Sequence, residues 1–366
     1  MADPRLDTLA SLLCTYSLEV EPGQLVLVEG PAREAGLLAA LTRQLTRMGA
    51  HAMVRPRLDS VEPLLLEVGS DEQLEYVSMI ERYEIDAPDR MLTIWAEANT
   101  RAMSAVPDGR QTIRRRAMRP VVDRFLEREG AGEIRWCGVT LPTAAQAQQA
   151  GMAVADYEEF VYNAAHLDDP DPVAHWRMVS ARQATVCERL SSVRELRIVA
   201  EDTDLTVDVG GRKWINADGH ENFPDGEVFT SPDETKTEGH IAFSFDAPYA
   251  GREVGGVRLW FEGGVVVREE ADRGEAFLRE MLDLDEGSRR LGEVAFGLND
   301  EIQSATGNIA FDEKIGGTCH VALGLAFPLA GGTNQSTLHW DMVCDLRDGG
   351  EVYGDGELLS KDGKFL

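Results

Sequence analysis

The sequence predicts an α/β N-terminal domain with parallel-sheet character, followed by a largely β (α+β) C-terminal domain. Apolar runs of strand length alternate with helical patterns in the first half, an acidic Pro-rich break follows, and short strand-like runs with Gly turns fill the rest. A chain of 366 residues is long enough for about two domains. We expect their limits at residues 1–180 and 181–366.

The first elements predict a βαβ unit. Residues 24–29 form a buried-strand pattern, 32–48 an amphipathic helix that a glycine ends, and 51–54 the next strand. Further patterns of strand, helix and strand lie at 91–95, 111–129 and 134–137. Gly30 and Gly36 fit neither a dinucleotide-binding fingerprint nor a phosphate-binding loop, so the sequence does not indicate a nucleotide site here.

The break Leu-Asp-Asp-Pro-Asp-Pro at residues 167–172 precedes a helix predicted over 173–190. Beyond it, apolar and polar residues alternate from 205 to 209. Gly210-Gly211 and then Trp214-Ile215 follow, which predicts a β-hairpin.

A histidine and an aspartate two residues apart mark a strand-like run near the C-terminus. In Leu338-His-Trp-Asp-Met342, alternation directs His339 and Asp341 to one face and the apolar side chains to the other, toward a core. An imidazole nitrogen beside a carboxylate oxygen suits a divalent transition metal. Taken alone, such a pair is more commonly solvated or hydrogen-bonded than metal-binding.

Three further donors lie upstream of this pair. His320 lies in a strand-like apolar run, Glu227 follows a Pro-Asp-Gly turn, and Glu293 precedes another apolar run. Singly, such a histidine is commoner as a core residue, and such a glutamate as a turn or helix-start carboxylate. Together with the first pair, they make the ligand set of two metal ions bridged by a carboxylate.

These donors lie within four longer motifs: Asn222–Phe229 (NFPDGEVF), Leu291–Ala295 (LGEVA), Asp312–Gly324 (DEKIGGTCHVALG) and Gly331–Asp341 (GGTNQSTLHWD). The N-terminal half adds Tyr16-Ser-Leu18, Pro22-Gly23, Glu29-Gly-Pro31, and Ala150-Gly-Met152 followed by Tyr157 and Phe160. In order, spacing and flanking residues, nearly the whole chain resembles the thermophilic metalloaminopeptidase family of the aminopeptidase T and aminopeptidase S type.

The resemblance implies a metal-dependent aminopeptidase that releases N-terminal amino acids from peptides through water activated by two divalent metal ions (Zn, Co, Mn or Mg). It implies the metal ligands Glu227, Glu293, His320, His339 and Asp341. Of these, Glu227 and Glu293 are the catalytic candidates, as metal bridge or proton shuttle, and the sequence does not divide these roles. The resemblance also implies a homodimer.

Two further residues of the third motif, and the histidines outside the motifs, need separate interpretation. Glu313 either orients a ligand or is a solvated turn residue. Cys319 alternates away from His320, which favours a small core residue over a thiol ligand. The remaining histidines are expected to be structural: His51, His166, His175, His220 and His240.

One position departs from the family pattern. Where the family characteristically carries a Tyr before Pro in its active site, this chain has Phe327 before Pro328. Loss of a hydroxyl aimed at the transition state can lower the rate by roughly 100- to 1000-fold. We therefore expect metal binding to be kept and turnover to be weakened.

The charge balance excludes some partners. The formal net charge is −28, and only five of the 36 basic residues are Lys. Such a surface is typical of proteins from high-salt cytoplasm, although an ordinary acidic cytosolic enzyme is the alternative. Either reading disfavours binding to nucleic acid or an anionic membrane. The basic run Arg114-Arg115-Arg116 is expected to pair with neighbouring acids on a solvated helix face.

The expected location is the cytoplasm. The N-terminus lacks a charged leader with an apolar core, and no stretch approaches transmembrane length. Five cysteines without paired spacing argue against a disulfide framework.

Two alternatives to an active peptidase remain. One is a ring-cleaving dioxygenase of the dihydroxypyridine type, which resembles the family in its C-terminal half but uses a single iron. Retention of both Glu227 and Glu293 favours two metals and hydrolysis. The other is a catalytically weakened peptide-binding homologue, suggested by Phe327.

Overall fold

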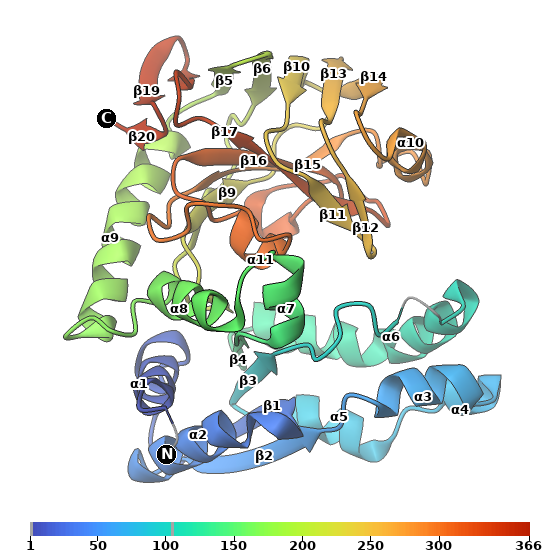
Figure 1. Ribbon diagram of the computed structural model, residues 1–366, viewed down its shortest axis with the longest axis vertical. Helices are drawn as coiled ribbons and strands as arrows, with labels where there is room; N and C mark the ends of the chain where they lie inside the picture. Colours follow the sequence, from blue (N-terminus) through green and yellow to red (C-terminus); the bar gives the residue numbers. More distant parts are fainter. Residues whose placement is uncertain (1–2, 104–105) are drawn as a thin grey trace. The chain divides into compact units, whose positions relative to one another are not determined.

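The computed structural model describes residues 3–103 and 106–366, which form two compact units (Figure 1). The N-terminal unit contains the described residues up to 148, together with 152–176 and 219–224. The C-terminal unit contains 149–151, 177–218 and 225–366. The helix α9 (Pro172–Ser191) belongs to the first unit up to Trp176 and to the second from Arg177.

The N-terminal unit is built on a five-stranded sheet in which every neighbouring pair is parallel, in the order β2-β1-β3-β4-β8. Its strands are β1 (Leu25–Pro31), β2 (His51–Arg57), β3 (Arg90–Trp95), β4 (Arg135–Thr140) and β8 (Asn222–Phe223). Buried apolar side chains such as Val28, Leu92 and Val139 fill the central strands, as expected for a parallel sheet covered on both faces. The predicted α/β character and the four predicted strands are confirmed, with small shifts at the strand ends.

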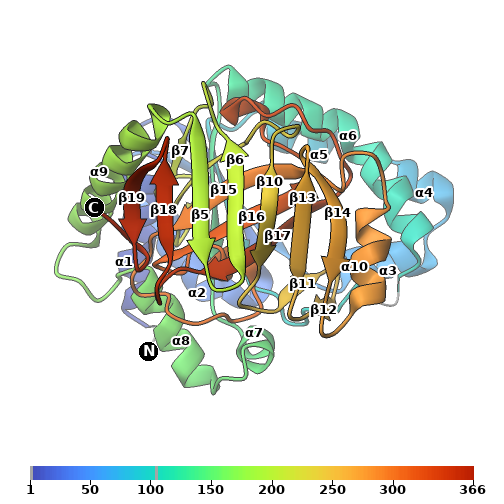
Figure 2. The same cartoon turned by 90° about the horizontal axis from the view of Figure 1, so that it is seen from above.

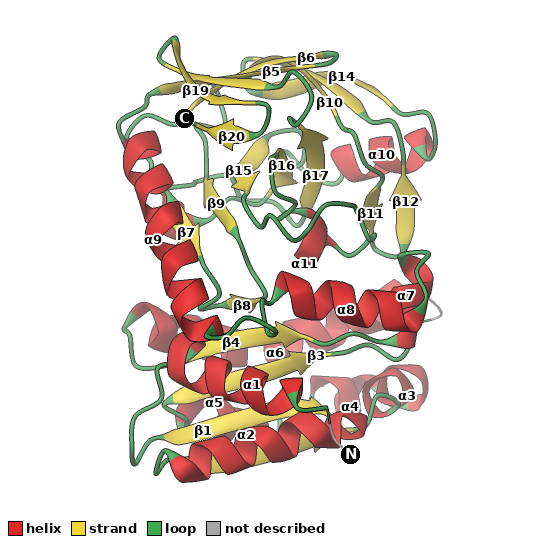
Figure 3. Ribbon diagram, turned by 60° about the vertical axis from the view of Figure 1, so that its left-hand side comes forward, coloured by secondary structure: helices red, strands yellow, loops and turns green. Residues whose placement is uncertain are grey.

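Two groups of helices accompany this sheet. The helices of this half of the chain are α1 (Arg5–Leu12), α2 (Ala35–Arg47), α3 (Val61–Val68), α4 (Asp71–Glu75), α5 (Met79–Asp86), α6 (Asp108–Gly130), α7 (Ala144–Gln149) and α8 (Val154–Ala164). In Figure 3, α1 and α2 lie in front of the sheet, and α5 and α6 lie behind it. The amphipathic pattern of α2 explains its position, because Leu37, Leu38, Leu41 and Leu45 form one buried face.

The C-terminal unit consists mainly of two antiparallel sheets. The eight-stranded sheet has the order β14-β13-β10-β6-β5-β18-β19-β20, and the five-stranded sheet has the order β17-β16-β15-β9-β7. Figure 2 shows the larger sheet lying over the smaller one. A single hydrophobic core joins them, since Ile198 and Val207 of the first sheet belong to the same buried cluster as Val321 and Met342 of the second. The largely β character predicted for this half is confirmed.

The elements of this half have the following bounds: β5 (Glu195–Ala200), β6 (Thr203–Asp208), β7 (Ile215–Ala217), β9 (Glu227–Thr230), β10 (Glu238–Ala242), β11 (Ala247–Tyr249), β12 (Arg252–Val254), β13 (Arg258–Glu262), β14 (Val265–Glu270), α10 (Glu275–Leu282), β15 (Leu291–Gly297), α11 (Ile309–Asp312), β16 (Thr318–Gly324), β17 (His339–Asp345), β18 (Glu351–Gly354), β19 (Glu357–Lys361) and β20 (Lys364–Phe365).

The predicted hairpin across Gly210-Gly211 is wrong. Strand β6 pairs with β5 and β10 in the larger sheet, whereas β7 pairs with β9 in the smaller one. The glycines are therefore part of a crossing between the two sheets, and Trp214 enters their shared core on the way. Alternation predicts that a segment is a strand, but it does not determine which strand becomes its partner.

Candidate metal centre

The five predicted ligands project from one face of the five-stranded sheet. Directly paired residues of antiparallel strands point to the same side, and so do residues two positions apart on one strand. Asp341 pairs with Ala322, which pairs with Glu293, so the two carboxylates share one row across β17, β16 and β15. His320 lies in the next row, opposite Ala295.

His339 and Glu227 complete the same face. His339 pairs with Gly324, and Glu227 pairs with Gly297. Alanine or glycine therefore stands beside each ligand, which leaves space above the sheet for the larger donor side chains. The opposite face is apolar, as predicted, since Trp340 and Met342 of β17 and Cys319 of β16 lie in the shared core.

Glu293 stands between the two histidines. One of its carboxylate oxygens lies 3.8 Å from His320 Nε2 and the other lies 3.4 Å from His339 Nε2. Glu227 approaches His320 Nε2 at 3.5 Å, and Asp341 approaches His339 Nε2 at 3.5 Å. A ligand that bridges two metal ions needs this arrangement, in which one carboxylate offers an oxygen to each side.

The donors divide into two groups, each with ligand atoms within 4.8 Å of one another. One group contains Glu227, Glu313 and His320, and the other contains Glu293, His339 and Asp341. Glu313 is partly buried and reaches the donor atoms of the first group. It is the sixth candidate ligand.

A buried lysine, which the sequence reasoning missed, lies beside the first group. Lys314 is fully buried, and its Nζ lies 3.6 Å from Glu227 Oε1 and 3.7 Å from Asp225 Oδ1 and bonds to Glu313. Its position in a carboxylate-rich motif of a lysine-poor chain was the available signal. Asp225, at the Pro-Asp-Gly turn, was also missed.

A glycine explains how this lysine reaches the sheet. A Cβ atom at Gly297 would lie 2.3 Å from the Ile315 carbonyl oxygen and 3.0 Å from that of Glu313. No side chain fits at that distance, so glycine on β15 allows the segment carrying Glu313 and Lys314 to pack directly against the strand. The segment thereby lies next to Glu227.

The donor set fits metal cations. Within the described part of the chain, the buried atoms Glu227 Oε2 and Asp341 Oδ1 have no hydrogen-bond partner. Buried polar atoms are almost always paired, so a bound ion is a natural partner for these two oxygens. In the protonation state that metal ligands need, with all carboxylates ionised and both imidazoles neutral, the carboxylates of Asp225, Glu227, Glu293, Glu313 and Asp341 and the ammonium of Lys314 would sum to a net charge of −4. Two divalent cations would balance that charge.

The tautomer of His339 suits a metal ligand that binds through Nε2. Its Nδ1 lies 3.0 Å from the Leu325 carbonyl oxygen, which only accepts hydrogen bonds. Nδ1 therefore carries the proton, and Nε2 faces Glu293 and Asp341. Ligating histidines commonly donate their other ring N–H to a carbonyl in this way.

The electrostatics show how strongly the groups interact. Burial raises the pKa of Glu227 well above its usual value, although Lys314 opposes that change. Burial also acts to raise the pKa of Glu293, but the interactions with His320 and His339 outweigh it and hold that pKa at about 2. Burial acts to lower the pKa of both histidines, yet the carboxylates raise them to about 9 for His320 and about 10 for His339. The site therefore attracts positive charge.

Phe327 lies at this site rather than away from it. Its ring contacts the candidate ligand His339 edge-on, with centroids 5.2 Å apart and an interplanar angle of 72°. Its other neighbour is Phe229, also at 5.2 Å. The backbone N–H of Phe327 donates to Ser231 Oγ. The ring of Phe327 thus lies beside the second group of candidate ligands.

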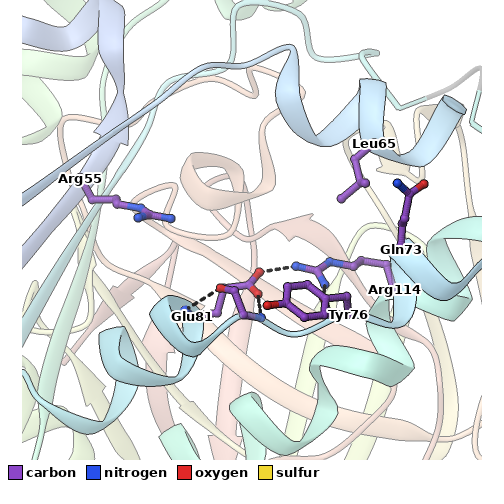
Figure 4. A pocket seen from close by; sticks show the side chains of 7 residues that line it. Arg55, Leu65, Gln73, Tyr76, Glu81 and Arg114 are labelled. Atoms are coloured by element: carbon purple, nitrogen blue, oxygen red, sulfur yellow. Dashed lines mark hydrogen bonds and ion pairs between the residues drawn. The ribbon is translucent and has the colours of Figure 1, made fainter. Parts of the chain in front are cut away.

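A separate cavity of about 400 Å³ lies in the N-terminal unit (Figure 4). It is lined by Arg55, Leu65, Gln73, Tyr76, Ser78, Glu81 and Arg114. The Arg114 guanidinium donates to Glu81 and to the Tyr76 carbonyl oxygen, so the charges on its wall are already paired. Arg116 pairs with Glu75, as expected for a solvated basic run. None of the predicted ligands lines this cavity.

Comparisons with known proteins identify a family of metal-dependent proteases. A family model described as thermophilic metalloprotease (M29) matches residues 2–365. Aminopeptidase 2 of Geobacillus stearothermophilus is 26% identical over 99% of this chain and 95% of the relative. Aminopeptidase T of Thermus thermophilus is 27% identical over 96% of this chain and 95% of the relative.

The fold also has a solved counterpart. The structure of wild-type AmpT from Thermus thermophilus superposes with a TM-score of 0.85 at 24% identity and covers 99% of both chains. A protease family and aminopeptidase relatives do not favour the ring-cleaving dioxygenase alternative.

Proposed function

Since this chain belongs to the thermophilic metalloprotease (M29) family and is a metalloaminopeptidase, we propose that it releases N-terminal amino acids from peptides with water activated by two divalent metal ions. The position of Glu293 supports two ions per chain, because this carboxylate offers one oxygen toward each histidine. A mononuclear site has no use for a carboxylate placed in this way.

The residues that would hold the ions follow from the two groups. Glu227, Glu313 and His320 would hold one ion, and His339 and Asp341 the other, with Glu293 between them. This assigns the bridge to Glu293. The ions, Zn, Co, Mn or Mg, would supply Lewis-acid polarisation of the peptide carbonyl and a lowered pKa of a shared water.

The chain's own residues position the reactants and move the proton. Glu227 Oε2, buried and without a hydrogen-bond partner among the described residues, is placed to accept a proton at the first group. Lys314 fixes the other oxygen of Glu227 and limits the repulsion between Glu227 and Glu313. The apolar ring of Phe327 covers His339 and reduces water access from that side.

Metal analysis and turnover test this proposal together. Protein purified without chelator should contain two divalent ions per chain, lose hydrolysis of aminoacyl substrates on chelation and regain it with added metal. One iron per chain with oxygen uptake on an aromatic substrate would overturn it. Tight peptide binding with two ions but no turnover would instead identify a peptide-binding homologue.

We also propose that the chain works in the cytoplasm. All five cysteines are free, and four of them are buried, which fits a reducing compartment. No helix in the described residues is long and apolar enough to cross a membrane. The acidic composition supports a halophilic origin, as argued from the sequence.

A homodimer is proposed on the apolar surface of the N-terminal unit. Eight exposed apolar side chains lie between residues 58 and 83, on α3, on α5 and in the segments beside them: Leu58, Val61, Leu64, Val68, Tyr76, Met79, Ile80 and Tyr83. Exposed apolar residues that cluster in this way indicate a protein interface. Light scattering on the parent and on a Val68→Glu, Met79→Glu variant tests this, because a variant as dimeric as the parent would exclude this surface.

A further inference from the structure

Two histidines that the sequence marks as structural meet an aspartate in the N-terminal unit. His166 follows α8, Asp169 lies in the next loop, and His175 lies in the first turn of α9. All three are partly buried, and one donor atom from each lies within 4.8 Å of the other two. None of them belongs to the candidate metal centre described above.

The donor atoms converge on one carboxylate oxygen. Asp169 Oδ2 lies 2.7 Å from His175 Nδ1 and 3.6 Å from His166 Nδ1. Two ligands of a tetrahedral ion with bonds of about 2.0–2.2 Å are about 3.4 Å apart, so separations of this size can be spanned by a single ion. The shorter contact is a close ion pair, and an ion would take the place of any proton between its two atoms.

The backbone holds these residues in place. His166 N–H donates to the Asn163 carbonyl oxygen at 2.8 Å, and His175 N–H donates to that of Asp171 at 3.0 Å. His166 has a φ of +54°, a conformation that L-residues seldom adopt but that histidine tolerates better than most. Behind it, the Trp176 ring packs edge-on at 6.3 Å, and Trp176 Nε1 donates to the Ala165 carbonyl oxygen.

The ring positions show what binding requires. The two imidazoles are stacked, with centroids 3.6 Å apart and an angle of 21° between their planes. An ion binds in the plane of each imidazole, so loading must turn one ring about its Cβ–Cγ bond. The side chains of His166 and His175 are 16% and 20% exposed, which leaves solvent-side room for that rotation.

We propose that His166, Asp169 and His175 form a further metal site, for a borderline transition-metal cation such as Zn²⁺. Two imidazole nitrogens and one carboxylate oxygen select such an ion over Mg²⁺ or Ca²⁺, which prefer oxygen ligands. The flanking Asp168 and Asp171 add negative charge that attracts a cation. Three protein ligands leave a fourth position for water. The ion would join the end of α8 to the start of α9.

Zinc titration of metal-depleted full-length protein tests this site. The parent should bind one more equivalent of Zn²⁺ than the variants His175→Ala and Asp169→Asn, with that step weakened by at least about 10-fold in each, since loss of even an outer hydrogen-bond partner of a metal ligand has this effect. His51→Ala, on the exposed face of β2 in the same unit, is the matched control and should keep every step. Zinc should raise the melting temperature of the parent more than that of His175→Ala.

Two further measurements separate the possible outcomes. Asp341→Asn should lose zinc at the candidate metal centre but retain the step that His175→Ala removes, so this inference and the proposed function can fail separately. His175→Gln, which keeps the polarity and nearly the size of the side chain, replaces His175→Ala if that variant does not fold. Equal zinc stoichiometry and affinity in the parent, His175→Gln and Asp169→Asn would overturn the proposal.

Discussion

At the scale of single residues, Lys314 has the clearest effect on the free energy of folding. Burial acts to lower its pKa, but Glu227, Glu313 and Asp225 raise it well above the usual value, so the ammonium stays charged inside the protein. Without it, these three neighbouring carboxylates would have only the His320 imidazole, 3.5 Å from Glu227, as a source of positive charge. In the proposed metal site, bound ions would supply an alternative source of positive charge for the same carboxylates.

We therefore expect Lys314→Met to destabilise the metal-free protein by about 3–5 kcal/mol, the cost of breaking a buried ion pair, and the metal-loaded protein by less. Urea unfolding with and without metal measures both values. Lys361→Met is the matched control, because Lys361 is half exposed and pairs with Glu351 at the surface, where such a pair contributes about 0–1 kcal/mol. Equal destabilisation with and without metal would contradict a charge-balancing role.

The ligand residues give a second prediction. Glu227→Gln and Asp341→Asn should each lower kcat/KM by more than the roughly 10- to 100-fold that loss of an outer hydrogen-bond partner costs. The amides keep the side-chain volume, and Gln avoids leaving Lys314 beside a cavity. Circular dichroism should show a retained fold. Asp345→Asn, on the same strand but paired with Arg347, should keep activity. Unchanged turnover in either ligand variant would remove that residue from the site.

Phe327 provides the third prediction. If the family's Tyr hydroxyl donates to the oxyanion, Phe327→Tyr should raise kcat by up to about two to three orders of magnitude with little change in KM. The ring that would carry the new hydroxyl lies beside the candidate ligand His339. Phe229→Tyr, on the neighbouring ring, adds a hydroxyl elsewhere and should not raise kcat. A kcat for Phe327→Tyr within twofold of the parent would defeat the idea of a weakened enzyme.

At the scale of elements, the loop before β17 is held by one carboxylate. Asp285 accepts hydrogen bonds from Ser288, Ser336 and Thr337, which fix the entry of the chain into the strand that carries His339 and Asp341. Burial acts to raise the pKa of Asp285, but these donors outweigh it and hold the pKa well below the usual value. The carboxylate therefore stabilises the fold only while it is ionised.

Asp285→Asn should accordingly destabilise the protein most near neutral pH. Because the folded pKa is depressed, the stabilisation is full above the unfolded pKa of about 3.9 and is lost as the pH falls toward the folded pKa. Urea unfolding of the metal-free parent and variant at pH 7 and at low pH measures the difference, which should shrink in acid. Asp283→Asn, an exposed neighbour paired with Arg289, is the control. A difference that grows in acid would refute the assignment.

The sequence predicted those properties of each element that depend on the periodicity of its apolar residues. The alternation in 338–342 predicted both the donor face and the core face of β17, because side-chain direction on a strand depends only on local order. Strand partners are long-range, so β6 and β7 were wrongly joined in a hairpin. Lys314 was missed because a lysine beside acids is usually a surface residue, and only the close approach at Gly297 buries it.

Other predictions from the sequence remain untested. The domain limits 1–180 and 181–366 stay a prediction, and so do the roles of the five predicted ligands. Their convergence from four strands could be expected only through the family resemblance, because β9, β15, β16 and β17 are separated by long stretches of chain. Spacing alone does not specify that these strands share one sheet.

At the scale of the whole molecule, two effects of salt oppose each other. Ion pairs between exposed side chains, such as Arg119 with Asp123 and Arg273 with Asp246, lose their attraction as salt rises. Each such pair is worth only about 0–1 kcal/mol, so their loss is small. The net charge of −28 acts in the other direction, because every unpaired acid repels the others until salt screens them.

We therefore expect the melting temperature to rise between 0.01 M and 1 M NaCl, as the Debye length falls from roughly 30 Å to roughly 3 Å. Most of that rise should occur where the Debye length drops below the separation of neighbouring surface charges. NaCl is the appropriate salt, since sulfate also strengthens apolar burial and would raise stability for a different reason. Urea unfolding at fixed NaCl concentrations provides the independent check. A melting temperature that is flat or falls across this range would mean that the ion pairs outweigh the repulsion, and would contradict the halophilic reading.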